Sequence, residues 1–98
     1  MSLDILIYTE KENKIISMSE TLHKSIYSYD DYKNYKQLRK IKDYYLADET
    51  FYGASLANLI AEFEKVKEHG RIEFKYELII LIDYLKNKNV ETVRFSGD

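Results

Sequence analysis

Residues 72–85, IEFKYELIILIDYL, hold the densest run of apolar side chains in this 98-residue chain. Their apolar positions recur at the spacing of one helical stripe, formed by Phe74, Leu78, Leu81, Ile82 and Leu85. Ile79 and Ile80 widen that stripe, so we expect this helix to be covered on more than one side and to form the centre of the core. An aspartate at Ile80 or Leu81 is then expected to abolish folding, because it would bury an unpaired charge.

The same stretch has an alternative interpretation as a strand. Apolar and aromatic residues alternate with charged ones from Ile72 to Leu78. The run continues to Leu85, however, which is long for a strand, and the lysines and asparagines that follow are typical of a helix end. The length of the apolar run and the residues that follow it therefore favour a helix over a strand.

Both ends of the chain favour strands. Leu3–Thr9 presents an apolar face on alternate residues and a mixed face between them. After a polar turn at Glu10–Asn13, Lys14–Met18 is predicted to return as the second strand of a hairpin. Val90–Phe95 alternates in the same way and is predicted to lie in the sheet beside the first strand.

Helical spacing recurs in the middle of the chain. Ser19 is expected to cap a short helix that carries Leu22 and Ile26. A longer helix over residues 30–45 is predicted to begin at Asp30 or Asp31. Its apolar stripe consists of Tyr35, Leu38, Ile41 and Tyr45, and its opposite face carries Lys33, Lys36, Arg39, Lys40 and Lys42.

The next helix is predicted to run from a Ser55 cap to Gly70 at its C-terminal end. Between this helix and the one predicted over residues 30–45, Ala47–Gly53 breaks the helical periodicity and is expected to be an ordered connection. The whole chain, residues 1–98, is then a single α+β domain. We expect a small sheet of about three strands, formed by both termini, packed against about four helices.

Composition narrows the class of protein. The chain has no cysteine, which excludes disulfides and thiolate chemistry. No apolar run approaches the ~20 residues that span a bilayer, and Asp4 stands where a signal peptide needs positive charge, so we expect a cytoplasmic protein without membrane contact. The net charge of −2 argues against nucleic acid as a partner, because general affinity for phosphate needs a surplus of cations.

The residue types that carry chemistry are sparse. His23 and His69 lack the spacing of metal ligands; His23 is expected to face solvent and His69 to lie in the last turn of a helix. Gly53-Ala54-Ser55 lacks the glycine that follows a nucleophilic serine, and three scattered glycines cannot cradle a phosphate. We therefore predict no catalytic residue, no cofactor and no metal, and a protein that is not an enzyme.

Carboxylates and tyrosines gather in the middle of the chain. Tyrosine beside charge supplies rigid contact area together with hydrogen bonding at protein interfaces. The predicted partner-binding residues are Asp43, Tyr45, Asp48, Glu49 and Tyr52. The alternative is that the tyrosines belong to the core and the acids around them are simply solvated.

The sequence is also compatible with two other functions. The basic, tyrosine-rich helix predicted over residues 30–45 suits a regulatory module or one that stacks single-stranded nucleic acid on aromatic rings. A small enzyme is the third interpretation. The oligomeric state and the identity of a partner do not follow from these patterns.

Four features of the chain, taken in order, resemble a family of small bacterial proteins. They are an opening strand, the segment Asp48–Tyr52, the helix Leu56–Val66 with its Leu-Ile-x-Glu-Phe-Glu run, and the ending Val93–Asp98. In that family the mid-chain motif resembles Y-G-D-T-x-F-N, and the chain closes with an aromatic strand and Phe-Ile-Gly-Asp. This chain departs from the motif with Ala47 for the glycine, an inserted Glu49 and no asparagine. The resemblance implies an immunity protein that neutralises a cognate bacterial toxin domain by occlusion.

Overall fold

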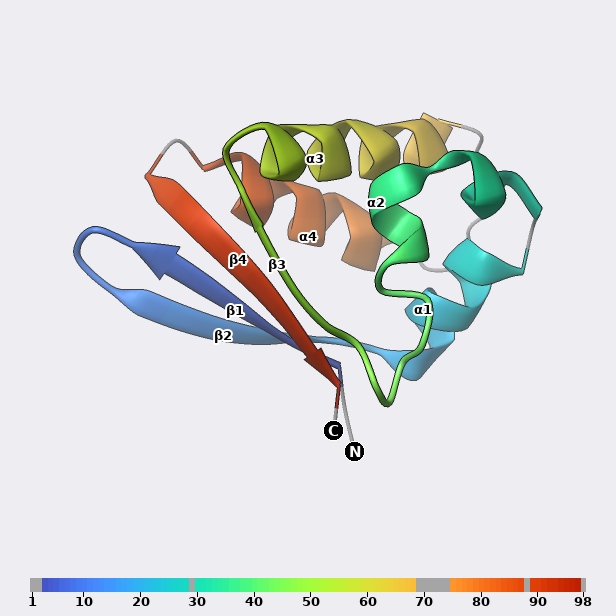
Figure 1. Ribbon diagram of the computed structural model, residues 1–98, viewed down its shortest axis with the longest axis horizontal. Coiled ribbons are helices and arrows are strands. Elements are labelled where there is room, and N and C mark those ends of the chain that lie inside the picture. The colour runs from blue at the N-terminus through green and yellow to red at the C-terminus, as the bar shows by residue number, and fades with distance from the viewer. Residues whose placement is uncertain (1–2, 29, 69–74, 88, 98) are drawn as a thin grey trace.

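The structure, a computed structural model, describes residues 3–28, 30–68, 75–87 and 89–97, and only the backbone of Asp30 and Asp31. These residues form an α+β fold in which a four-stranded sheet has its helices on one side (Figure 1). In chain order the elements are β1 (Leu3–Thr9), β2 (Asn13–Met18), α1 (Glu20–Tyr27), the 3-10 helix η1 (Asp30–Asn34), α2 (Lys36–Arg39), β3 (Asp48–Tyr52), α3 (Gly53–Glu68), α4 (Lys75–Lys86) and β4 (Val90–Gly97). The predicted class is confirmed, with four strands instead of three.

The strands lie in the order β2-β1-β4-β3, and every pair is antiparallel. β1 stands between its hairpin partner β2 and the last strand, so Ile5 is opposite Ile16 on one side and Phe95 on the other. Leu3 pairs with Gly97, which brings the two ends of the described chain together (Figure 1). The predicted hairpin and the return of the last strand beside the first are both confirmed.

β3 is the strand that the sequence did not predict. The segment expected to be a connection pairs instead with the free edge of β4, where Phe51 lies opposite Val93 and is fully buried. Thr50, Phe51 and Tyr52 all have side chains that favour strands. Five residues are too few for a clear alternation, so the pairing depends on the edge that β4 provides.

The core lies between one face of the sheet and the helices. Alternate strand residues point into it and are fully or almost fully buried, namely Leu3, Ile5, Ile7, Phe51, Val93 and Phe95. The rings of Phe51 and Phe95 meet edge to face with centroids 5.6 Å apart, and Phe63 of α3 stacks on Phe95. Three phenylalanines from β3, β4 and α3 therefore join the sheet to its helical layer.

α4 confirms the predicted helix from Lys75 onward; the part of the prediction at residues 72–74 lies outside the described residues. Leu78, Leu81, Ile82 and Leu85 are buried on one stripe. The expectation that Ile80 belongs to the core is wrong, because its side chain is 56% exposed. Two residues advance a helix by roughly 200°, which turns Ile80 away from the side that Leu78 and Ile82 bury. No helix in the described segments is long and apolar enough to cross a bilayer.

A carboxylate from α4 completes the cap of α1. Ser19 is the N-cap, as predicted, and its hydroxyl accepts a hydrogen bond from the Leu22 N–H at 3.0 Å. The Glu77 carboxylate accepts two more, from the Ser19 backbone N–H at 2.9 Å and from its hydroxyl at 2.7 Å. The start of one helix is thereby fixed to the first turn of another.

The continuous helix predicted over residues 30–45 is wrong. The chain forms η1, then α2 of only four residues, and then a turn. Tyr35 has extended backbone angles, and the Glu62 carboxylate of α3 accepts hydrogen bonds from the N–H groups of Gln37 and Leu38. These two N–H groups, which a continuous helix would pair with carbonyls four residues earlier, are held by a side chain from elsewhere in the fold.

Side chains of α1 form hydrogen bonds with backbone carbonyls that follow this break. The Tyr27 hydroxyl donates to the carbonyl of Leu38, and the His23 ring nitrogen Nε2 lies 2.9 Å from the carbonyl of Ile41. A helix continuing to residue 45 would use both carbonyls internally. Competition from tertiary hydrogen bonds therefore explains why the apolar periodicity here did not produce one helix.

The prediction that Ser55 is the N-cap of this helix is wrong, because α3 begins at Gly53 and Ser55 lies inside its first turn. Gly53 has φ of +53°, a left-handed conformation that glycine adopts without strain and that turns the chain from strand into helix in one step. The Ser55 hydroxyl accepts from the Tyr52 N–H at 3.0 Å and donates to the Tyr52 carbonyl at 2.8 Å. Ser55 thus stabilises the strand-to-helix junction from inside the helix. The predicted end at Gly70 lies outside the described residues.

Aspartates at Leu81 and Ile80 form a matched pair that tests the orientation of α4. Leu81→Asp should cost about 4 kcal/mol or more and abolish cooperative unfolding, because the new charge is buried without a partner. Ile80→Asp should change the free energy of unfolding by about 1 kcal/mol or less, since its side chain reaches solvent. Urea denaturation of both variants checks this. Equal losses at the two positions would show that Ile80 is buried after all.

Glu77→Ala should lower the free energy of unfolding by about 1–3 kcal/mol, because it leaves the Ser19 N–H without its acceptor. Asp83→Ala removes an exposed carboxylate from the same helix and should cost about 0.5 kcal/mol or less. Thermal melts of the two variants under identical conditions measure the difference. Indistinguishable melting temperatures would mean that the α1 cap does not depend on α4.

Candidate functional site

The five predicted partner-binding residues lie in three places. Asp48 and Tyr52, on β3, point to the sheet face opposite the helices. Glu49 points the other way, because it shares its face with buried Phe95, and it is half-buried at the sheet edge. Asp43 and Tyr45 belong to the turn that follows α2. The structure therefore does not bring the five together as one patch.

Among the described elements, no helix packs on the sheet face opposite α1–α4 (Figure 1). We call it the open face, and its side chains are those of Asp4, Leu6, Tyr8, Asn13, Ile15, Ser17, Asp48, Thr50, Tyr52, Thr92, Arg94 and Ser96. Each of these residues is exposed or half-buried. Ile15 and Tyr52 are the most prominent large side chains, at 66% and 67% exposure.

Strand register arranges the open face in rows. One row crosses the sheet as Ile15, Leu6, Arg94 and Thr50, and the next as Asn13, Tyr8, Thr92 and Tyr52. The face therefore has an aliphatic pair on the β2 side, a guanidinium on β4 and a tyrosine at the β3 edge. Such a mixture of aliphatic, aromatic and guanidinium groups is characteristic of surfaces that bind proteins.

Arg94 and Asp48 form an ion pair across the open face. The Arg94 Nε donates to Asp48 Oδ1 at 3.0 Å, and this hydrogen bond raises the pKa of the Arg94 guanidinium. Both side chains reach solvent, so the pair adds little to stability. The pair instead orients the guanidinium toward β3, the strand that carries Asp48.

Sequence reasoning missed Leu6, Tyr8, Ile15 and Arg94 as site residues. The sequence signal for these residues was strand alternation: they occupy the positions between the core-facing residues of the terminal strands. Alternation of this kind shows which residues share a face. It does not show whether a helix covers that face, which depends on where the helices pack.

The turn that carries Asp43 and Tyr45 is fixed against the end of β4. Asp43 Oδ1 accepts hydrogen bonds from the N–H groups of Tyr45 and Leu46 at 3.0 and 3.1 Å. The carbonyl of Ala47 accepts from the Gly97 N–H, and a Cβ on Gly97 would lie only 2.6 Å from the carbonyl carbon of Tyr45. Glycine is therefore required at residue 97 for the turn to approach the strand.

The two tyrosines of this turn have different roles. Tyr44 is buried, and its hydroxyl donates to the carbonyl of Met18 at 2.9 Å. Tyr45 is 41% exposed, and the nearby negative charge of Glu20 raises the pKa of its hydroxyl. Tyr44 therefore belongs to the core, whereas the ring of Tyr45 is accessible at the surface.

A hollow of about 590 Å³ lies beside this turn, and we call it the basic hollow. Its lining consists of Glu20, His23, Lys24, Arg39, Lys40, Lys42, Asp43, Tyr44 and Tyr45. Two predicted site residues, Asp43 and Tyr45, therefore contribute to a concave surface on the helical side of the molecule. Four of the nine residues that line it are cations.

His23 lies beneath this hollow. The expectation that it faces solvent is wrong, because it is 5% exposed and its ring lies against those of Tyr27 and Tyr44, at 4.6 and 5.2 Å between centroids. Burial lowers the pKa of the imidazole, although the hydrogen bond to the carbonyl of Ile41 and the charge of Asp43 oppose this. The neutral ring is therefore favoured in the folded protein. His69 lies outside the described residues.

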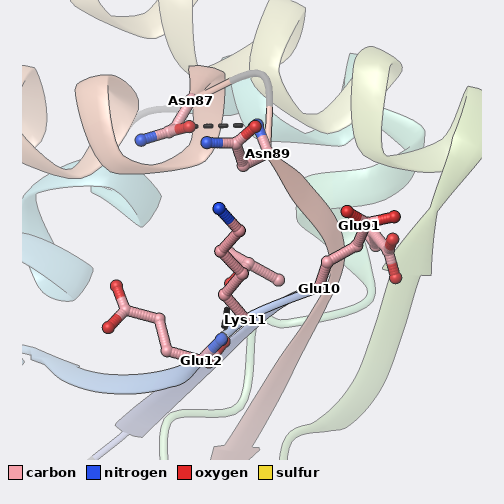
Figure 2. A pocket seen from close by; sticks show the side chains of 7 residues that line it. Glu10, Lys11, Glu12, Asn87, Asn89 and Glu91 are labelled. Atoms are coloured by element: carbon pink, nitrogen blue, oxygen red, sulfur yellow. Dashed lines mark hydrogen bonds between the residues drawn. The ribbon is translucent and has the colours of Figure 1, made fainter.

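A second hollow, of about 700 Å³, lies where the β1–β2 turn meets the start of β4. Its lining residues are Thr9, Glu10, Lys11, Glu12, Asn87, Asn89 and Glu91. Figure 2 shows the Lys11 amino group pointing into the hollow toward the two asparagines. Despite the three glutamates, the described residues contain no set of three or more side chains arranged to hold a metal ion.

No protein-family model, no curated protein and no solved structure matches this chain. The open face and the basic hollow are the two surfaces whose geometry bears on function.

Buried His23 should make the stability of the protein depend on pH. Its folded-state pKa lies below the ~6.5 of an unfolded histidine, so the unfolded state binds the proton first as pH falls. The free energy of unfolding should therefore decline below about pH 6.5, down to the lowered pKa of the folded state. Urea denaturation from pH 8 to pH 5 measures the decline.

His23→Gln supplies the control, because glutamine does not titrate and every other group, His69 included, is unchanged. The variant should show a shallower decline than the original protein over the same pH range. Parallel curves would contradict the assignment of His23 as the acid-sensitive group.

Proposed function

We propose that this chain is a non-enzymatic protein-binding module that uses the open face, most concretely an immunity protein that blocks a toxin domain by covering its active site. The observation that carries the proposal is the placement of Tyr8, Tyr52, Leu6, Ile15 and Arg94 on one uncovered sheet face. Tyrosine and arginine are among the residues that contribute most binding energy at protein interfaces. An aliphatic pair beside them supplies apolar area that gains from being covered.

The rigidity of the sheet supports occlusion as the mode of action. The central strands β1 and β4 carry Leu6, Tyr8 and Arg94, and each is paired along both edges. The backbone of paired strands is already ordered before binding, so no contact energy is offset by ordering a loop. A broad, preformed face of this kind suits a partner whose own surface is already folded.

The charge of the open face supports a protein partner over a nucleic acid. Asp4 and Asp48 stand against Arg94, so this face has no surplus of cations with which to neutralise phosphates. The whole chain carries a net charge of −2, which assists the approach of a basic partner surface. A basic toxin cleft has the complementary sign.

The nucleic-acid alternative assumed one continuous helix over residues 30–45. That helix is broken, and Tyr44, one of its tyrosines, is buried with its hydroxyl engaged. The stacking surface that the alternative requires is therefore not present in the form it assumed. No specific observation favours this function over protein binding.

The experiment pairs this chain with the product of the neighbouring gene, which is tested as the candidate toxin domain. Co-expression should restore growth of cells that produce the toxin domain, and the two purified proteins should form a complex. Tyr52→Ala should weaken that complex by about 2 kcal/mol, roughly 30-fold, because it removes an exposed ring from the open face. Calorimetric titration gives the affinity and a thermal melt shows that the variant is folded.

Tyr76→Ala is the matched control, since Tyr76 is even more exposed but lies on α4, away from the open face. It should leave both affinity and melting temperature nearly unchanged. Equal losses of affinity for the two variants would place the interface elsewhere. A neighbouring gene without toxin activity would remove support for immunity while leaving the open face testable against other partners.

A further inference from the structure

The basic hollow is not used by the proposed protein interface, and its charges are unbalanced. It is built from α1, α2 and the turn that follows α2, whereas the open face is on the other side of the sheet. Lys24, Arg39, Lys40 and Lys42 line it against two acids, Glu20 and Asp43. Most of that positive charge comes from three residues within one short stretch, 39–42.

Within the described part of the chain, Arg39, Lys40 and Lys42 have no carboxylate partner. Among the described side chains, no carboxylate oxygen lies within 4.0 Å of the charged nitrogens of Arg39, Lys40 or Lys42. Two of them contact aromatic rings instead: the Lys40 Nζ is 5.9 Å from the centroid of Phe51 and the Lys42 Nζ is 5.2 Å from that of Tyr32. Such contacts limit the motion of the ammonium groups without neutralising them.

The two acids of the hollow are already engaged. Asp43 accepts hydrogen bonds from two backbone N–H groups of its own turn. Glu20 lies 3.6 Å from the Lys24 amino group, and its negative charge raises the pKa of the Tyr45 hydroxyl. Neither acid is paired with the three cations of residues 39–42, which leaves their positive charge available to a ligand.

We propose that the basic hollow is a binding site for a small phosphate-bearing polyanion. Arg39 supplies a planar fork that matches two phosphate oxygens, and Lys40 and Lys42 supply point charges beside it. Tyr45 lines the same hollow, and its ring adds contact area beside these cations. The whole chain carries a net charge of −2, so an extended polyanion would meet repulsion outside the hollow. This favours a small anion as the ligand.

Titration with inorganic pyrophosphate at low ionic strength tests the site, with amide chemical shifts as the readout. The largest shifts should fall on residues 39–45. The double variant Arg39→Gln/Lys42→Gln should lose affinity by about tenfold or more, since it removes two charged donors. Lys65→Gln/Lys75→Gln removes the same charge from exposed positions on α3 and α4 and should stay within about twofold of the original protein.

Thermal melts establish that both double variants are folded, and Lys42→Gln alone provides a milder change should the first variant unfold. Equal losses in the two double variants would overturn the proposal, because binding would then follow net charge alone. Shifts spread over the whole surface would overturn it as well. A short oligothymidylate that binds tenfold more tightly than pyrophosphate, and loses affinity in the same variant, would replace the small anion with a nucleic acid.

Discussion

The antiparallel pairing of β1 with β4 is the interaction on which the rest of this structure depends. It joins the two ends of the described chain, so its formation closes a loop that contains every helix. Ile5 and Ile7 stand opposite Phe95 and Val93, and these four side chains form the floor of the core. The outer edges of the same pair then accept β2 on one side and β3 on the other. Because this contact spans nearly the whole sequence, we expect it to form late in folding.

Hydrogen bonds with side chains distant in sequence determine where the helices in the middle of the chain begin and end. Glu77 fixes the start of α1, Glu62 fixes the start of α2, and His23 with Tyr27 hold the carbonyls beyond it. Each bond joins residues from different elements, so the elements begin and end where the tertiary fold supplies a partner. The same bonds shape the basic hollow, since His23 and the residues after α2 line it.

The two proposed surfaces follow from different physical properties of the fold. On the open face, paired strands hold tyrosine, arginine and aliphatic side chains in a flat array with little net charge. In the basic hollow, a broken helix gathers cations over buried aromatic rings. The sheet and its helical layer separate these surfaces, so occupation of one leaves the other accessible.

By itself, the sequence determined the α+β class, the three terminal strands, the Ser19 cap and the helical state of α4, because each depends on local periodicity or capping. The sequence also indicated Asp48 and Tyr52 as site candidates, but it could not show that they share a sheet face with Tyr8 and Arg94. Only the tertiary structure decided that residues 48–52 pair with β4, that the helix over 30–45 breaks, that His23 is buried and that Ile80 is exposed. In each case the physical reason is that a partner distant in sequence provides the strand edge, the hydrogen bond or the covering surface, and periodicity along the chain contains no information about such a partner.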